Sequence, residues 1–215
     1  MEEDEADYWT AFPRTRATDR SPPTLAIRHA GPIEPLPSRS EGDAPTVPDL
    51  LRTPLFGQSE TGEELATYAI LDAARSVGLV ERMEVAGLER ACLFKGEAEE
   101  EMADVAPWFV RLEEGSTFTR DLFTQGEAGW HLWGQDVGIY LRSRAGLDEL
   151  RRHFRRFTRV QDRTGRWFYL RFYDPAYLFA YLPALEPMKL ATFMGDVDSF
   201  VAVTDDTAHI LSVTG

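Results

Sequence analysis

The chain has 215 residues, 43% of them hydrophobic and 12% aromatic, which is enough for one domain with an appended arm. Its apolar runs are far shorter than the ~18 residues of a membrane-spanning helix, and its acidic N-terminus is unlike a signal peptide. A net charge of −13 repels a phosphate backbone. We therefore expect a cytoplasmic protein that contacts neither membrane nor nucleic acid.

The first segment, residues 1–60, contains 9 of the 13 prolines. Each proline fixes its own φ and restricts the residue before it. This composition predicts a Pro-rich arm or linker that is extended and partly disordered, with no room for a helix or a central strand. Leu50, Leu51 and Phe56 are the apolar residues expected to anchor it. Two alternatives stay open, a free tail and an arm that packs along the domain or a partner.

The segment 61–215 is expected to form the domain, because short strand and helix patterns alternate along it. Apolar runs with β-compatible residues predict strands at 66–72, 90–95, 108–112 and 131–142. Apolar residues at helical spacing predict helices at 78–87 and 116–123, the second capped by Ser116 or Thr117. The acidic stretch 97–101 is expected to be a turn.

The clearest helix signal lies at 143–157. Apolar residues recur there every three or four positions and predict one buried face, formed by Leu147, Leu150, Phe154 and Phe157. Arginines 151, 152, 155 and 156 fall mostly on the other faces. Residues 140–175 hold ten basic and four acidic residues between acidic flanks. Such a basic band suits an acidic partner, a nucleic acid or acidic segments of the same chain.

Residues 158–175 predict a hairpin whose second strand is strongly aromatic. That strand, 166–173, has aromatic or apolar side chains on both faces, so we expect it to be buried rather than to stack on nucleic-acid bases. Asp174 is placed to cap the following helix, with Pro175 at the first helical position. Arg171 and Asp174 suggest an internal ion pair more than a catalytic pair, since arginine keeps its proton.

The C-terminal part predicts a short helix at 175–185 and up to three strands, at 189–195, 199–204 and 208–215. Strands interleaved with helices, together with at least one hairpin, predict an α+β fold with a mixed sheet of short strands.

Each template for chemistry is incomplete in this sequence. There is no glycine-rich phosphate loop, no Gly-x-Ser-x-Gly elbow and no Asp-x-Asp-x-Asp-Gly calcium loop, and the four histidines are far apart. The single cysteine, Cys92, lies in an apolar run and is expected to be an inert core thiol. We therefore expect no catalytic residue, no metal and no cofactor.

Six stretches occur in collinear order over residues 66–198: YAILDAAR, LFKGE, DVAPWFVRL, LRSRAGLDELRRHFRRF, VQDRTGRWFYLRFYDPAYL and KLATFMGDV. The most specific element is Arg171–Pro175, RFYDP. With these stretches the chain resembles the type VI secretion effector-chaperone or adaptor family, long catalogued as domain of unknown function 4123. Residues 1–60 lie outside the resemblance.

The resemblance implies a bacterial cytoplasmic adaptor without enzymatic activity. Proteins of this family bind a cognate toxin effector and help load it onto the VgrG-type spike of the secretion machine. The candidates for partner contact or for structure are Arg151, Arg152, Arg155, Arg156, Arg159, Arg171, Tyr173 and Asp174. A small cytosolic hydrolase that uses an acidic cluster, or a nucleic-acid-binding module, stays as the alternative.

Overall fold

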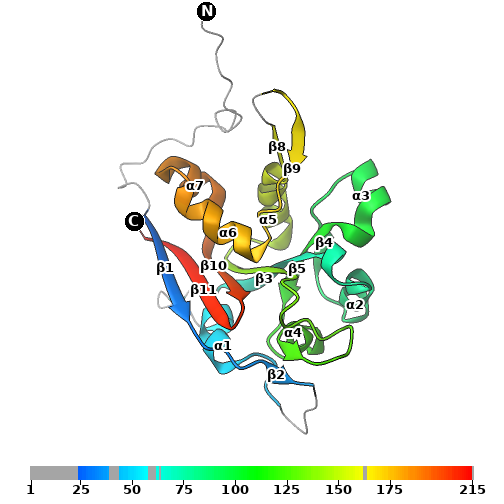
Figure 1. The fold of residues 1–215 in the computed structure, drawn as a ribbon. Helices are drawn as coiled ribbons and strands as arrows, with labels where there is room; N and C mark the ends of the chain where they lie inside the picture. Colours follow the sequence, from blue (N-terminus) through cyan, green and yellow to red (C-terminus); the bar gives the residue numbers. More distant parts are fainter. Residues whose placement is uncertain (1–23, 39–43, 58–61, 63, 162–163, 215) are drawn as a thin grey trace, which may run out of the picture.

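A seven-stranded sheet forms the centre of the fold (Figure 1). The computed structural model describes residues 24–38, 44–57, 62, 64–161 and 164–214. The strand order is β1-β11-β10-β7-β3-β5-β4, and every pairing in this sheet is antiparallel. The strands are β1 (Thr24–Ala30), β3 (Ala66–Asp72), β4 (Arg90–Cys92), β5 (Pro107–Leu112), β7 (Gly138–Ser143), β10 (Val197–Thr204) and β11 (Thr207–Thr214).

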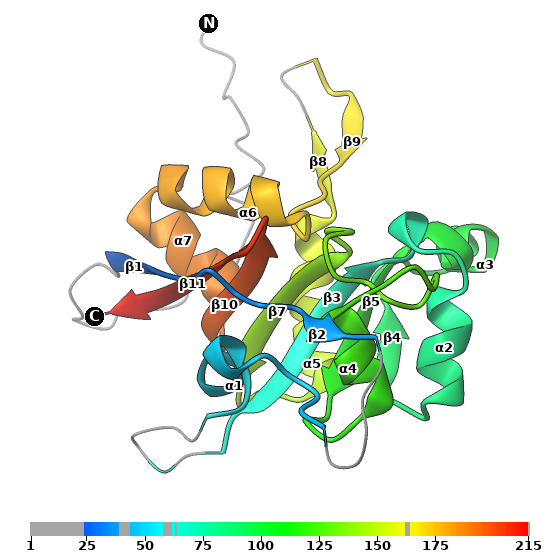
Figure 2. The same ribbon diagram turned by 60° about the horizontal axis from the view of Figure 1, so that its bottom comes forward.

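Two small pairings lie outside the large sheet. The two-residue strands β2 (Leu36–Pro37) and β6 (Thr124–Gln125) pair in parallel. The strands β8 (Arg159–Gln161) and β9 (Trp167–Tyr169) form an antiparallel hairpin. This hairpin projects away from the body of the molecule in both ribbon views (Figures 1 and 2).

Helices pack on both faces of the sheet, because successive strand residues point to opposite sides. In β3, Ala69 and Leu71 belong to one core cluster, whereas Tyr68 and Ile70 belong to the other. The first cluster includes α1 (Asp49–Phe56), α2 (Leu79–Val85) and α4 (Thr117–Leu122); the second includes α5 (Leu147–Phe154), α6 (Pro175–Tyr181) and α7 (Pro187–Met194). The remaining helix, α3 (Glu97–Met102), buries none of its residues. Short 3₁₀ turns lie at Ala73–Arg75, Ala103–Val105, Arg155–Phe157 and Leu182–Ala184. The predicted α+β class is confirmed, but the large sheet is antiparallel throughout and not mixed as expected.

Several local predictions from the sequence are also confirmed. The helix α5 and the 3₁₀ turn after it bury all four predicted residues, Leu147, Leu150, Phe154 and Phe157. Ser116 caps α4 by accepting a hydrogen bond from the backbone N–H of Phe118.

The prediction that residues 1–60 contain no helix is wrong. The helix α1 forms with Pro48 at its N-cap and Pro54 inside it. Leu51 and Leu55 lie one turn apart, and both are completely buried, so burial outweighs the hydrogen bond that Pro54 removes. Of the expected anchors, Leu51 is buried and Phe56 packs against the core, whereas Leu50 is exposed. The rest of the predicted arm, residues 1–23, 39–43 and 58–60, lies outside the described residues.

Three further expectations are wrong. Residues 189–195 were expected to form a strand, but 189–194 belong to the helix α7, in which Leu190, Phe193 and Met194 are buried at helical spacing. The acidic stretch 97–101 is helical, with acidic side chains in the first turn, where they favour a helix N-terminus. Residues 131–137 form a loop, and the strand begins only at Gly138.

An aromatic cluster joins the helices of the second face to the sheet. Phe154 of α5 lies at its centre, with ring centroids 5.5 to 6.0 Å from those of four other phenylalanines: Phe109, Phe172, Phe193 and Phe200. These rings come from β5, the segment before α6, α7 and β10, and all are completely buried. Offset and edge-to-face contacts at these distances add to the free energy gained by burial.

We predict that Phe154→Ala lowers the free energy of unfolding by about 3–5 kcal/mol, because it removes the central ring and leaves a cavity. Urea unfolding followed by circular dichroism measures the change. Phe154→Leu, which keeps most of the volume, is expected to cost less, and Arg152→Ala at an exposed position should cost less than about 0.5 kcal/mol. A loss below about 1 kcal/mol for Phe154→Ala would contradict the central role of this ring.

His153 lies beside the cluster as a neutral imidazole. Its Nε2–H donates to the backbone oxygen of Phe193 at 2.8 Å, and its Nδ1 accepts from the Arg156 guanidinium at 2.7 Å. Burial lowers the pKa of His153 below its ordinary value, and the charge of Arg156 lowers this pKa further. Protonation therefore opposes folding at this position.

We predict that this histidine makes the protein less stable in mild acid. Because the folded-state pKa is lowered, the unfolded chain binds the proton first, so stability is lost as pH falls below about 6.5. His153→Gln keeps a neutral donor and acceptor but cannot be charged. Urea unfolding is measured between pH 7.5 and pH 5.5. The free energy of unfolding of the wild type should fall more over this range than that of His153→Gln. Two parallel pH curves would exclude the effect.

Candidate partner-binding surface

The predicted arginines on α5 do not all have the same role. Arg151 points back into the fold: its Nε donates to the backbone oxygen of Cys92 at 2.7 Å, and its Nη2 lies 3.3 Å from Glu99. Its side chain is 23% exposed. Arg151 therefore links α5 to the end of β4 and to α3, and most of its hydrogen-bonding capacity is used inside the protein.

Arg152, Arg155 and Arg156 lie three and four positions apart, so they share one side of α5 and of the turn that follows. Arg152 and Arg156 are exposed, and Arg155 is half-buried. Arg152 donates to the backbone oxygen of Asp148, its own neighbour one turn earlier, at 3.3 Å. On this helix, a partner can therefore reach Arg152 and Arg156 fully and Arg155 in part.

The β8–β9 hairpin carries the largest difference from the sequence-based expectation. The aromatic strand was expected to be buried on both faces, but Trp167, Phe168 and Tyr169 are 41%, 42% and 53% exposed. The strand ends at Tyr169; beyond it Leu170 packs against the core, and Phe172 and Tyr173 are buried in it. The aromatic run is therefore divided between a projecting hairpin and the segment that enters α6.

Arginines stack on the exposed rings of this hairpin. The guanidinium carbon of Arg159 lies 4.9 Å from the ring centroid of Trp167 and 5.9 Å from that of Tyr169, and that of Arg166 lies 5.0 Å from Phe168. Arg159 is the direct cross-strand neighbour of Tyr169. Stacked guanidinium groups keep planar N–H donors that suit carboxylates. The hairpin thus offers apolar rings and positive charge together.

The hairpin base is fixed to the body by one further ring. Tyr169 and Phe94 lie with their centroids 5.2 Å apart, and Phe94 follows β4 in the chain. The backbone N–H of Leu170 donates to the oxygen of Thr158 at 2.9 Å, which extends the ladder beyond β8 and β9. The hairpin is therefore attached at its base while its rings remain accessible.

Arg171, Tyr173 and Asp174 belong to a network of charges at the joint between β3 and α6. The sequence suggests a pair between Arg171 and Asp174, but each has another partner: Arg171 pairs with Asp72, and Asp174 pairs with Arg75 at 2.8 Å. The side chain of Asp72 is 4% exposed. Asp174 also accepts hydrogen bonds from two backbone N–H groups in the first turn of α6, as predicted for its cap.

Tyr173 is buried beside this network. Burial and the nearby Asp72 carboxylate raise the pKa of Tyr173 to about 12. The phenol therefore stays neutral at physiological pH. The run RFYDP holds two distant parts of the chain together, since Asp72 and Arg171 are 99 positions apart.

The remaining chemical groups stay separate. Cys92 is buried, and burial raises the pKa of its thiol, which agrees with the inert thiol expected from the sequence. Within the described ranges, no three of the histidine, cysteine and acidic side chains come together as they would around a metal ion.

Sequence reasoning missed the exposed rings of the hairpin. The polar run QDRTGR at 161–166 was the available signal, because a long polar turn leaves room for only a few paired residues on each side. Strand periodicity alone does not tell whether an aromatic face has anything to pack against.

We predict that Arg171→Ala lowers the free energy of unfolding by about 1–3 kcal/mol, because it leaves the buried Asp72 carboxylate without its nearest cation. Arg171→Lys keeps the charge and should lose less. Thermal and urea unfolding of both variants, with Arg152→Ala as an exposed control, measure the effect. If Arg171→Ala matches the control, the network does not stabilise the joint.

Comparison with known proteins adds one match. Residues 67–192 match the family model described as Domain of unknown function (DUF4123), which covers the segment from β3 to α7 with α5 and the hairpin. No curated protein and no solved structure matches the chain. Among the described residues, no helix has the length and apolar character needed to cross a membrane. The chain belongs to the DUF4123 family, a family associated with type VI secretion effector adaptors.

Proposed function

We propose that this protein is a type VI secretion adaptor that acts in the bacterial cytoplasm. It binds a cognate toxin effector and helps to load it onto the VgrG-type spike, without catalysing a reaction. The proposal is carried by the projecting β8–β9 hairpin, which presents three exposed aromatic rings with stacked arginines inside the segment that matches the family.

The chemistry of the hairpin suits a protein partner. Aromatic and arginine side chains contribute most to binding at protein interfaces, because aromatic rings bury large areas with few rotatable bonds and the guanidinium group offers several planar hydrogen-bond donors. The whole chain has a net charge of −13, so the basic hairpin and the arginine side of α5 are a local exception. An effector surface with acidic groups around an apolar centre complements both features, and this complementarity favours one orientation of docking.

The first test replaces the rings. Trp167→Ala with Phe168→Ala is expected to weaken binding of the effector encoded beside this gene by about 30-fold or more, as for a group of dominant interface residues. Co-purification and calorimetry of the co-expressed pair measure it. Met188→Ala, which removes another exposed apolar side chain, is the matched control and should leave affinity unchanged. Equal affinity for both variants, with unchanged thermal unfolding, would refute the role of the hairpin.

The second test reverses charge. Changing Arg152, Arg155 and Arg156 together to glutamate should abolish co-purification with the effector while the variant stays folded. The affinity of the wild-type protein for the effector should also fall with added salt, because exposed charges are screened. Retained co-purification in the triple variant would remove α5 from the binding surface.

A further inference from the structure

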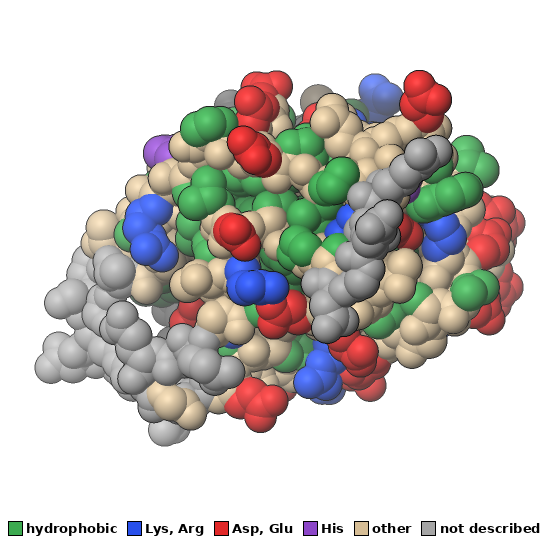
Figure 3. All heavy atoms as spheres, turned by 90° about the horizontal axis from the view of Figure 1, so that it is seen from below, with side chains coloured by type: hydrophobic (Ala, Val, Ile, Leu, Met, Phe, Trp, Pro, Cys, Tyr) green, Lys and Arg blue, Asp and Glu red, His purple; other side chains and the backbone are tan. Residues whose placement is uncertain are grey.

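A small recess lies on the first face of the sheet, apart from the hairpin. It forms where the end of α4, the loop 132–137, the start of β7 and the turn between β10 and β11 meet. It has about 30 Å³ of room, which suits one group of the size of a water molecule or an ammonium ion. None of its lining residues belongs to α5 or to the hairpin. On the molecular face of Figure 3, hydrophobic side chains lie among both acidic and basic ones.

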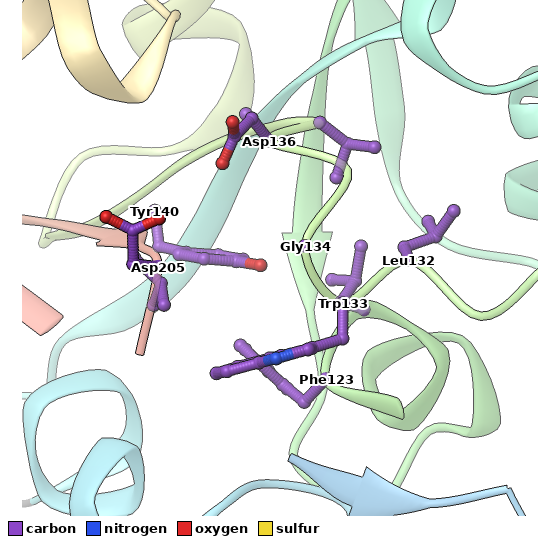
Figure 4. A pocket seen from close by; sticks show the side chains of 11 residues that line it. Phe123, Leu132, Trp133, Gly134, Asp136, Tyr140 and Asp205 are labelled. Atoms are coloured by element: carbon purple, nitrogen blue, oxygen red, sulfur yellow. The ribbon is translucent and has the colours of Figure 1, made fainter. Parts of the chain in front are cut away.

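The hydroxyl group of Tyr140 points into this recess (Figure 4). The residue is only 5% exposed, and within the part of the chain that the structure describes its hydroxyl makes no hydrogen bond. The hydroxyl opens onto the recess, so a donor that enters from outside can reach its oxygen. Burial raises the pKa of Tyr140, which keeps the phenol protonated. Its oxygen lone pairs are then available to a donor.

Two carboxylates give the recess its charge. Asp136 and Asp205 line it and are exposed, and neither takes part in an ion pair or hydrogen bond within the described segments. The lining contains no lysine, arginine or histidine. A water molecule would satisfy the Tyr140 hydroxyl equally well, but two carboxylates that line the same recess favour a cation over water.

Aromatic rings complete the environment. Phe123, Trp133 and Tyr140 line the recess, and the rings of Phe123 and Tyr140 have centroids 5.3 Å apart. The faces of aromatic rings attract cations that lie within about 6 Å of the ring centroid. Carboxylates, aromatic faces and a hydroxyl acceptor together match a primary ammonium group, which donates hydrogen bonds and carries one positive charge.

We propose that this recess binds the ammonium group of a lysine side chain on the partner protein. The butyl stem of the lysine lies against the aromatic rings, and its ammonium group donates to Tyr140 and faces Asp136 and Asp205. The choice of a protein lysine rests on the proposed adaptor function, whereas the ammonium site itself does not. The recess gives the adaptor a contact of opposite charge to that of the hairpin.

The site is tested on the isolated full chain with n-butylammonium, which copies the lysine side chain. The indole N–H signal of Trp133 in a ¹⁵N-labelled sample is identified by its loss in Trp133→Phe. It should shift saturably with n-butylammonium and not with n-butanol at equal concentration and ionic strength. Equal shifts with both compounds, or no shift with the amine, would overturn the site.

Three variants assign the contacts. Asp205→Asn should weaken amine binding about threefold and Asp136→Asn with Asp205→Asn about tenfold. Asparagine tolerates the left-handed backbone of these positions, at φ 48° and 53°, so the fold is kept. Asp206→Asn removes a neighbouring charge outside the recess and should stay within twofold of wild type. Tyr140→Phe should weaken the binding of the amine while leaving the other indole signals unchanged.

The partner is tested separately. The variant with Asp136→Asn and Asp205→Asn should bind the effector or the spike protein more weakly than the wild type does. The loss of affinity should be at least as large as the loss measured for the amine. If the amine binds but affinity for both proteins is unchanged, the lysine of a partner is excluded. If the wild-type chain binds the amine but neither the effector nor the spike protein, the adaptor proposal fails and the ammonium site stands.

Discussion

The packing around Phe154 is the constraint on which the second face of the molecule depends. Its ring lies among rings from β5, α7, β10 and the segment before α6, so α5 has one orientation only. With that face buried, Arg152 and Arg156 are directed outward. Phe172 is held in the same cluster, so the chain before it leaves the body as a hairpin. The core therefore determines what the surface presents.

The sequence predicts those parts of the fold in which a local pattern coincides with burial. Spacing in α5, the cap at Asp174 and the continuous apolar run of β3 are of this kind. It fails where the rest of the molecule decides the outcome: Leu51 and Leu55 are buried in a helix that contains Pro54, and Trp167 on the projecting hairpin remains 41% exposed although Arg159 stacks on its ring. The same holds for the candidate site, since partners such as Asp72 lie far away in the chain.

Two separate regions of the surface, the hairpin and the recess, share no residue and differ in charge. The hairpin brings rings and positive charge, whereas the recess brings rings and negative charge. A partner that meets both must carry complementary groups at both places, which restricts binding to one arrangement and disfavours proteins that offer only one. For an adaptor, such a requirement separates the cognate cargo from other proteins that are merely acidic or merely basic.

The strand order has a practical consequence. The family match ends at residue 192, before β10 and β11, yet β10 pairs directly with β7 in the middle of the sheet. A fragment cut to the matched boundaries would lose β10 and expose the backbone of β7 from Tyr140 to Ser143. Open edges of this kind recruit other chains. A shortened version of the chain therefore needs β10 and β11, up to residue 214, to keep this edge of β7 paired.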